Sequence, residues 1–148
     1  MTTVVSPVTG RAIELAYVPD RSFAQGEAGP GLAIEPVSAI GKAVAPIDGV
    51  VTEIGPFMYT VEGDDGRGVK VHLGIGTERL TGDGFHTLVA RGARVRAGQP
   101  VVGWDVTAVE AGGCCPMVPV VALDAEARSL KVRAGGSVVS GDALYDWW

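Results

Sequence analysis

Short β-type runs separated by turn-forming residues limit the folds open to this chain more than any other feature. The sequence contains 22 glycines and 9 prolines among 148 residues, and few stretches show long helical periodicity. Apolar or alternating runs occupy residues 12–18, 32–37, 50–54, 58–62, 69–73, 100–104, 118–123, 130–133 and 137–139. Strands of this length and spacing are typical of antiparallel sandwiches and barrels. We therefore predict an all-β fold, an antiparallel β-sandwich or barrel.

Smaller local patterns refine this prediction. Segments 86–91 and 106–111 have the pattern of short helical turns, and Asp64-Asp65-Gly66 between two β runs predicts a hairpin. A weak internal echo relates residues 45–51 to residues 92–102, and it supports a folded β architecture rather than a particular function. Because no linker or low-complexity segment divides the chain, residues 1–148 are expected to form a single domain.

Charge and hydropathy argue against several classes of function. The formal net charge is −5 and the isoelectric point is about 4.9, whereas nucleic-acid binding requires a basic face. We expect no membrane span, because the chain has no run of about 18 apolar residues. The N-terminus lacks the basic and apolar segments of a secretory signal, so a cytoplasmic location is expected.

The two cysteines, Cys114 and Cys115, are adjacent. Neighbouring cysteines are poorly placed for an ordinary disulfide, which needs a specific separation and orientation. Zinc sites usually space their ligands further apart and use four of them. We therefore interpret the pair as two small apolar side chains in a loop before Pro116.

His72 is the residue with the clearest chemical potential. It ends a β-type run, directly before glycine-rich turns, and His86 is the only other histidine. An imidazole titrates near neutrality, so much of it is available as a nucleophile. The flanking glycines would allow a partner's backbone to approach closely. On spacing alone, a single histidine in a strand is more often structural.

The segment from His72 to Phe85 resembles the phosphorylation-site signature of the glucose-type enzyme IIA domain of the bacterial sugar phosphotransferase system. The matching positions are His72, Gly74, Ile75, Thr77, Leu80, Gly82, Gly84 and Phe85. Further stretches follow in the family's order, namely Ser6-Pro7-Val8-Thr9-Gly10, Val18-Pro19-Asp20, Phe23-Ala24, residues 29–34, residues 44–49 and Pro119-Val120-Val121. The ordered set spans nearly the whole chain.

This resemblance implies a fold of the duplicated hybrid motif type and a phosphocarrier function in sugar uptake. His72 would accept phosphate from the histidine phosphocarrier protein and pass it to a cysteine of a IIB domain in a glucose-family permease. Partners would thus be the phosphocarrier protein and IIB/IIC permease domains, together with regulated metabolic or transport proteins. The docking pocket would include Phe57, Tyr59, Gly74, Gly76, Thr77 and Phe85. No metal or cofactor is expected.

Departures from the family pattern at five positions surround the proposed acceptor. Phe57 stands in the place of the family's second histidine, and Gly76 stands in the place of an aspartate. Gly55 replaces a hydroxyl residue, and Arg21 and Ser22 replace residues that are commonly apolar. Phenylalanine cannot donate a hydrogen bond to a phosphoryl oxygen, and losing one such donor costs roughly 10²–10³ in rate at well-studied sites.

These departures leave three interpretations open. His72 still accepts phosphate but transfers it slowly, or the domain is a degenerate or regulatory paralogue, or its partners changed with it. A non-catalytic binding module is therefore the main rival to the relay. His86 would compensate for Phe57 only if the fold brought it next to His72, and we expect it to be an exposed polar residue.

Two other classes with related β architecture fit poorly. A zinc peptidase needs about three protein ligands and an open position, and this chain lacks both a third histidine and a His-x-His pair. A biotinyl or lipoyl carrier needs a lysine at an exposed hairpin tip, and Lys42, Lys70 and Lys131 lie in other contexts.

Overall fold

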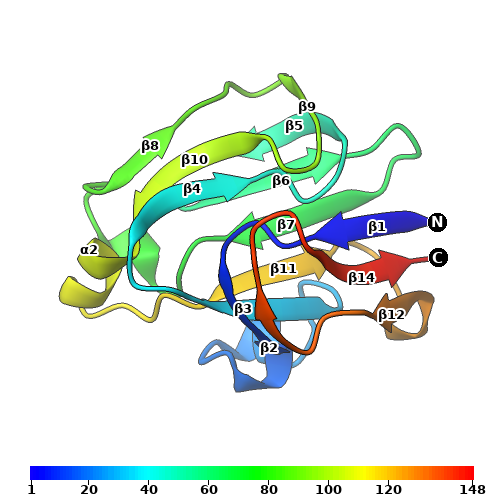
Figure 1. The fold of residues 1–148 in the computed structure, drawn as a ribbon, viewed down its shortest axis with the longest axis horizontal. Helices are drawn as coiled ribbons and strands as arrows, with labels where there is room; N and C mark the ends of the chain where they lie inside the picture. Colours follow the sequence, from blue (N-terminus) through cyan, green and yellow to red (C-terminus); the bar gives the residue numbers. More distant parts are fainter.

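Three antiparallel sheets make up most of the computed structural model, which describes residues 1–148 (Figure 1). The large sheet has the order β13 (Gly136–Val138), β2 (Gly10–Glu14), β3 (Gly31–Pro36), β11 (Val118–Ala122), β7 (Gly68–His72), β6 (Met58–Glu62), β5 (Gly49–Ile54) and β9 (Arg94–Val95). One small sheet has the order β1 (Thr2–Val5), β14 (Ala143–Trp147) and β12 (Leu130–Val132). The other has the order β4 (Ile40–Val44), β10 (Pro100–Asp105) and β8 (Phe85–Thr87).

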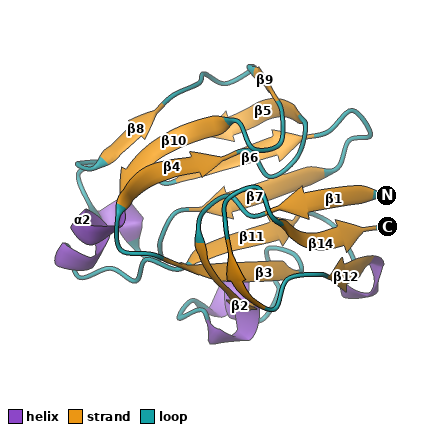
Figure 2. Ribbon diagram, viewed as in Figure 1, coloured by secondary structure: helices purple, strands orange, loops and turns teal.

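Helices are few and short, as Figure 2 shows. They are α1 (Arg21–Ala24), α2 (Val106–Ala111) and the 3₁₀ turns η1 (Leu15–Tyr17), η2 (Thr77–Arg79) and η3 (Ala127–Ser129). No helix is both long and apolar enough to cross a membrane. The prediction of an all-β antiparallel fold with short helical turns is confirmed.

The main hydrophobic core lies between the large sheet and the two small sheets. It contains 28 buried residues, with Val71 from β7, Trp104 from β10 and Tyr145 from β14 among them. Two buried tyrosines keep their hydroxyls satisfied, since Tyr59 donates to the carbonyl of Val44 and Tyr145 to that of Val120. Burial raises the pKa of both tyrosines, because an ionised phenol would lose its hydration there.

A second, smaller cluster covers the opposite face of the large sheet. It joins Leu15 and Val18 of the η1 region and Phe23 of α1 to Ala33 of β3 and Val121 of β11. Consequently β11 is buried on both faces, which explains its unbroken apolar sequence. Side chains alternate along a strand, so a residue on this second face differs in environment from its immediate neighbours.

Most of the expected strands are present, and the hairpin at Asp64-Asp65-Gly66 joins β6 to β7 as predicted. The echoing segments 45–51 and 92–102 lie side by side, because Gly49 pairs with Val95. The helical turn predicted at 106–111 is α2. Sequence reasoning missed β1, β4, β8, β9 and β14.

Two local predictions are wrong. The strand expected over residues 12–18 ends at Glu14, because the chain then turns into η1 and places Leu15 in the smaller cluster. The helical turn expected over residues 86–91 is not formed. Instead β8 pairs with β10, and the amide of Leu88 donates to the carbonyl of Val101. Hydrogen bonds to a distant strand override the local preference there.

Candidate functional site

The site is built around His72, the last residue of β7. Val69 and Val71 of this strand are buried in the main core, and by alternation Lys70 and His72 lie on the other face. There the imidazole is partly exposed, and its ring packs edge-on against Phe23 of α1 with ring centroids 5.6 Å apart. The second hydrophobic cluster therefore supports the histidine from one side.

A single hydrogen bond defines which nitrogen of His72 is available for chemistry. Its Nδ1 lies 2.6 Å from the carbonyl oxygen of Gly74. A carbonyl only accepts hydrogen bonds, so Nδ1 carries the proton and donates it. In the neutral ring, Nε2 then keeps its lone pair and is the nucleophilic atom.

The loop after His72 holds this carbonyl in place. The amides of Gly74 and Ile75 donate to the carbonyls of Met117 and Cys115, and the Thr77 hydroxyl donates to Leu73 over 3.0 Å. Gly74 has a φ of +85°, and a Cβ there would lie 2.5 Å from Cγ2 of Thr77. Both the backbone conformation and the crowding require glycine at this position.

Asp20 positions α1, and with it the aromatic neighbour of His72. Its carboxylate accepts hydrogen bonds from the amides of Ser22 and Phe23 and from the Ser22 hydroxyl. The Ser22 hydroxyl bond, together with these amides and the charge of His72, lowers the pKa of Asp20 from its ordinary value of 3.8, against the opposing effect of burial. Asp20 therefore remains ionised beside the histidine at neutral pH.

The ring of Phe57 packs against the main core. It packs edge-on against Phe85 at 4.9 Å between centroids, and Phe85 in turn contacts Trp104. Its backbone lies next to the end of β7, since the carbonyl of Phe57 accepts from the amide of Leu73. This position thus supplies packing to the site and no hydrogen-bond donor from its side chain.

The structure separates the remaining predicted pocket residues into two groups. Gly76 is partly exposed in the loop after His72. Gly74, Thr77 and Phe85 are buried, so they can support the site but cannot contact a partner directly. Thr77 and Tyr59 have no exposed surface, so the prediction that either lines a docking pocket is wrong. Thr77 instead bonds to the carbonyl of Leu73, and Tyr59 belongs to the main core. Alternation along β6 points its side chain into the main core, where its hydroxyl is already bonded.

His86 does not replace the missing second histidine. It is exposed on β8, in the small sheet, where it pairs with Gly103 of β10. No hydrogen bond or ring contact joins it to His72. The expectation that His86 is an exposed polar residue is confirmed.

Sequence reasoning missed a set of contacts made by Arg79 and Cys114. Arg79 donates from Nε to the carbonyl of Gly76 over 3.2 Å, and its Nη2 lies 3.6 Å from the sulfur of Cys114. The Cys114 thiol donates to the same Gly76 carbonyl over 3.4 Å. Both cysteines are free thiols, and Cys114 is buried as expected for a small apolar side chain. No local pattern connects positions so distant in the sequence.

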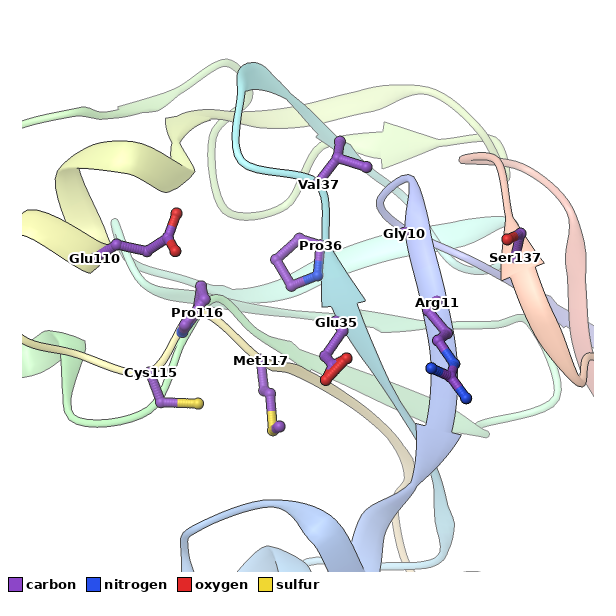
Figure 3. A pocket seen from close by; sticks show the side chains of 10 residues that line it. All are labelled: Gly10, Arg11, Glu35, Pro36, Val37, Glu110, Cys115, Pro116, Met117 and Ser137. Carbon is purple, nitrogen blue, oxygen red and sulfur yellow. The ribbon is translucent and has the colours of Figure 1, made fainter.

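A shallow hollow of about 500 Å³ adjoins the loop (Figure 3). It is lined by Gly10, Arg11, Glu35, Pro36, Val37, Glu110, Cys115, Pro116, Met117 and Ser137. Cys115 and Met117 connect it to the site, because their carbonyls hold the amides of Ile75 and Gly74. No group of three or more histidine, cysteine, aspartate or glutamate side chains is arranged to hold a metal ion.

Comparison with known proteins assigns this architecture to a family. A model of the phosphoenolpyruvate-dependent sugar phosphotransferase system, EIIA 1, matches residues 2–128. The glucose permease IIA from Mycoplasma capricolum has a similar solved structure, with a TM-score of 0.88 at 27% identity, over 97% of this chain and 93% of that one. The chain belongs to the EIIA family of the sugar phosphotransferase system.

Relatives of two lengths match this chain. The N-acetylglucosamine-specific EIICBA component of Klebsiella pneumoniae is 36% identical over 97% of this chain, which spans 22% of that protein. The glucose-specific EIICBA component of Staphylococcus carnosus is 32% identical over 95%, and the chain spans 21% of it. The glucose-specific EIIA component of Haemophilus influenzae is 29% identical over 95% of this chain and 85% of its own length. The chain thus spans about a fifth of the EIICBA relatives.

Proposed function

We propose that this chain is a phosphocarrier of a sugar phosphotransferase system, with His72 as the covalent carrier. The observation that supports this most directly is the hydrogen bond from Nδ1 to the carbonyl of Gly74, which in the neutral ring leaves the Nε2 lone pair free on a partly exposed side chain. Family membership supplies the context, since phosphoryl relay is the role that the family's name describes. Residues 1–148 would act as one domain in this relay.

The proposed reaction consists of two phosphoryl transfers. In the first, the Nε2 lone pair bonds to phosphorus while the P–N bond of the phosphocarrier protein's phosphohistidine breaks, and its electron pair returns to that imidazole. In the second, the thiolate of a IIB cysteine attacks phosphorus and the P–N bond to His72 breaks. Such steps depend mainly on positioning and charge stabilisation.

The surroundings of His72 position its ring well for phosphoryl transfer, but they offer little to stabilise the charge of the phosphoryl group. Phe23 and the loop carbonyl of Gly74 fix the ring, so the nucleophile is oriented before a partner arrives. Phe57 offers no donor to the phosphoryl oxygens, so we expect transfer that is slower than a site with two histidines would give.

The partners follow from the same proposal. The donor would be the histidine phosphocarrier protein, and the acceptor a IIB domain coupled to a IIC permease. The names of the EIICBA relatives from Klebsiella pneumoniae and Staphylococcus carnosus support this choice, because they join these domains in one chain. We expect the permease domains, rather than this one, to select the sugar.

The test is phosphorylation of the purified protein with phosphoenolpyruvate, enzyme I and the phosphocarrier protein. We expect one acid-labile, base-stable phosphate that is lost in His72→Ala and retained in His86→Gln. The second variant is a matched control, since His86 is exposed and remote from the site. Absence of label with cognate partners would overturn the relay and leave a regulatory binding module as the better account.

A further inference from the structure

The loop after His72 does not fix its own shape. Gly74 and Gly76 both adopt left-handed backbones, with φ of +85° and +75°, and only Ile75 lies between them. Glycine has the greatest backbone freedom of all residues, so a loop with two of them needs bonds from outside. Main-chain carbonyls hold the amides of Gly74 and Ile75. The carbonyl end of the loop, at Gly76, is held by side chains instead.

Two side chains from separate segments converge on the carbonyl of Gly76. Arg79 donates to it from Nε over 3.2 Å, and the Cys114 thiol donates to it over 3.4 Å. Nη2 of Arg79 also lies 3.6 Å from the Cys114 sulfur, so the three groups close a ring of contacts. A carbonyl only accepts hydrogen bonds, so the thiol is protonated and its sulfur is free to accept from the guanidinium.

The two side chains of this clamp, Arg79 and Cys114, are both held in place. Cys114 is only 6% exposed, so packing sets the position of its sulfur. Arg79 takes part in none of the ion pairs of the chain, and its side-chain bonds go to Gly76 and Cys114. A planar guanidinium can reach both acceptors at once, whereas the ammonium of a lysine lacks this forked geometry.

We propose that Arg79 and Cys114 are positioning residues for His72. By holding the carbonyl of Gly76, they hold the loop in which the carbonyl of Gly74 accepts the Nδ1 proton, and that bond leaves Nε2 free to attack. A thiol alone is a weak donor, so the clamp acts through both side chains together. The inference rests on the proposed function, because it assigns these two residues to the reaction of His72 with phosphate donors.

The first readout is the tautomer of His72, measured from the nitrogen chemical shifts of its ring at about pH 8.5, where an ordinary imidazole is neutral. His86→Gln is the background, because His86 is the only other histidine, and we expect a protonated Nδ1 in it. Arg79→Lys keeps the charge but loses the fork, and Cys114→Ala loses the thiol. In both variants the shifts should move toward exchange of the proton between the two nitrogens. Cys114→Ser retains a donor and should keep the background shifts.

The second readout is the phosphorylation rate of His72. With the cognate phosphocarrier protein, we expect Arg79→Lys and Cys114→Ala to lower kcat by about tenfold and to leave KM unchanged. Phosphoramidate is a small donor that needs no docking face, and its P–N bond breaks as Nε2 attacks phosphorus and ammonia leaves. Its reaction should slow by the same factor. A rise in KM without a fall in kcat would overturn the proposal, because it would indicate docking rather than positioning.

The double variant Arg79→Lys with Cys114→Ala tests whether both side chains act through one carbonyl. Residues in one hydrogen-bond network are not additive, so kcat should fall about as far as in each single variant, and a loss of about a hundredfold would contradict the shared clamp. Val138→Ala is the control for lost stability. It truncates a buried side chain of β13, at an edge of the large sheet away from β7, and should leave both readouts unchanged.

The two readouts separate this inference from the proposed function. A wild-type protein that neither donor labels would overturn the proposed function, whereas the nitrogen shifts would still show whether the clamp positions His72. A labelled wild type whose Arg79→Lys and Cys114→Ala variants match it in both readouts would overturn the clamp and leave the phosphocarrier function standing.

Discussion

At the scale of single residues, the site depends on a glycine carbonyl and a histidine ring. The bond from Nδ1 of His72 to Gly74 selects the tautomer, and Gly74 adopts the required backbone only because it has no side chain. The nucleophile therefore depends on a residue that has no functional group of its own.

Replacing Gly74 with alanine should damage both stability and chemistry. The new Cβ meets Thr77 at 2.5 Å in a left-handed backbone, so we expect a loss of about 3 kcal/mol in the free energy of unfolding. Urea unfolding measures this loss, and labelling of His72 should slow as its carbonyl partner shifts. Gly98→Ala is the matched control, because Gly98 shares the left-handed backbone, with φ +90°, and has open space around it. Equal losses in the two variants would contradict the role of crowding.

Phe57→His tests what the missing donor costs. The carbonyl of residue 57 bonds to the amide of Leu73, the neighbour of His72, so an imidazole at position 57 could donate to a phosphoryl group on His72. We expect transfer from the phosphocarrier protein to accelerate by about tenfold to a hundredfold. Thermal stability should fall, because the ring contact with Phe85 is lost. Phe57→Leu removes the same contact without adding a donor, and it should not accelerate transfer.

At the scale of elements, β7 and α1 cooperate to present the histidine. Alternation along β7 places His72 on the face opposite the main core, and α1 brings Phe23 onto that face. A helix of four residues has little stability of its own, so its cap and its buried Phe23 must hold it in place.

Asp20→Ala should loosen α1 in a pH-dependent manner. The cap is worth about 1 kcal/mol. Because the folded state lowers the pKa of Asp20, its stabilisation is complete above the ordinary value of 3.8 and is lost as the pH falls through the lowered value. Urea unfolding should thus show a difference from the wild type at pH 7 that shrinks below pH 3.8.

The matched control for Asp20 is Asp105→Ala, which removes the equivalent cap from α2. It should cost similar stability at neutral pH but leave the rate of His72 labelling unchanged, since α2 has no ring in contact with His72. A labelling rate that falls equally in both variants would point to general destabilisation rather than to α1.

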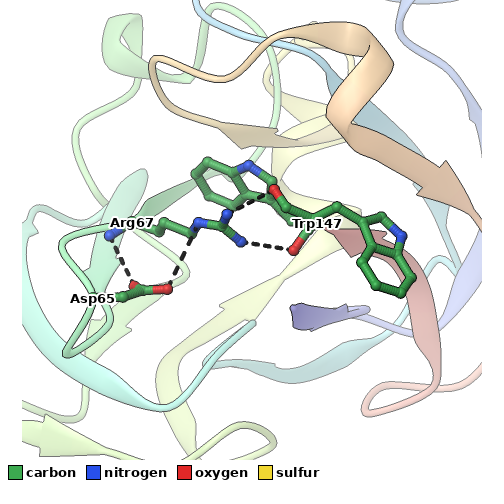
Figure 4. A network of polar contacts seen from close by, with 4 residues as sticks. Asp65, Arg67 and Trp147 are labelled. Carbon is green, nitrogen blue, oxygen red and sulfur yellow. Dashed lines mark hydrogen bonds and ion pairs between the residues drawn. The ribbon is translucent and has the colours of Figure 1, made fainter.

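At the scale of the whole molecule, Arg67 joins the β6–β7 hairpin to Trp147 and Trp148. From the turn between β6 and β7 it donates to the main-chain oxygens of Trp147 and Trp148 over 2.7 and 2.6 Å (Figure 4). Its guanidinium also lies 4.9 Å from the Trp147 ring centroid and near the Asp65 carboxylate. The small sheet of β1, β14 and β12 is thereby tied to the large sheet.

Arg67→Ala should lower the free energy of unfolding by about 2 kcal/mol, because two charge-assisted hydrogen bonds and a cation–π contact are lost. Arg94→Ala is the control, since its ion pair with Asp64 is exposed and worth at most about 1 kcal/mol. Chemical unfolding of both variants measures the difference. A loss for Arg67→Ala no greater than that for Arg94→Ala would refute the tie.

Local sequence patterns determined the parts of this protein that depend on neighbouring residues. The β6–β7 hairpin follows from alternating runs around Asp64-Asp65-Gly66, and the buried β11 follows from its unbroken apolar run. The end of β7 at His72 was also predictable, because glycine-rich turns follow it. These features need only strand periodicity and the conformational freedom of glycine.

Tertiary structure alone decided the features that join distant residues. Strand β14 exists because Trp147 pairs with Thr2, and β8 because it pairs with β10. The burial of Tyr59, the tautomer of His72 and the contact of Arg79 with Cys114 likewise depend on packing and on hydrogen bonds between separate segments. A sequence reports the preferences of adjacent residues, whereas these contacts arise only after the sheets have brought remote groups together.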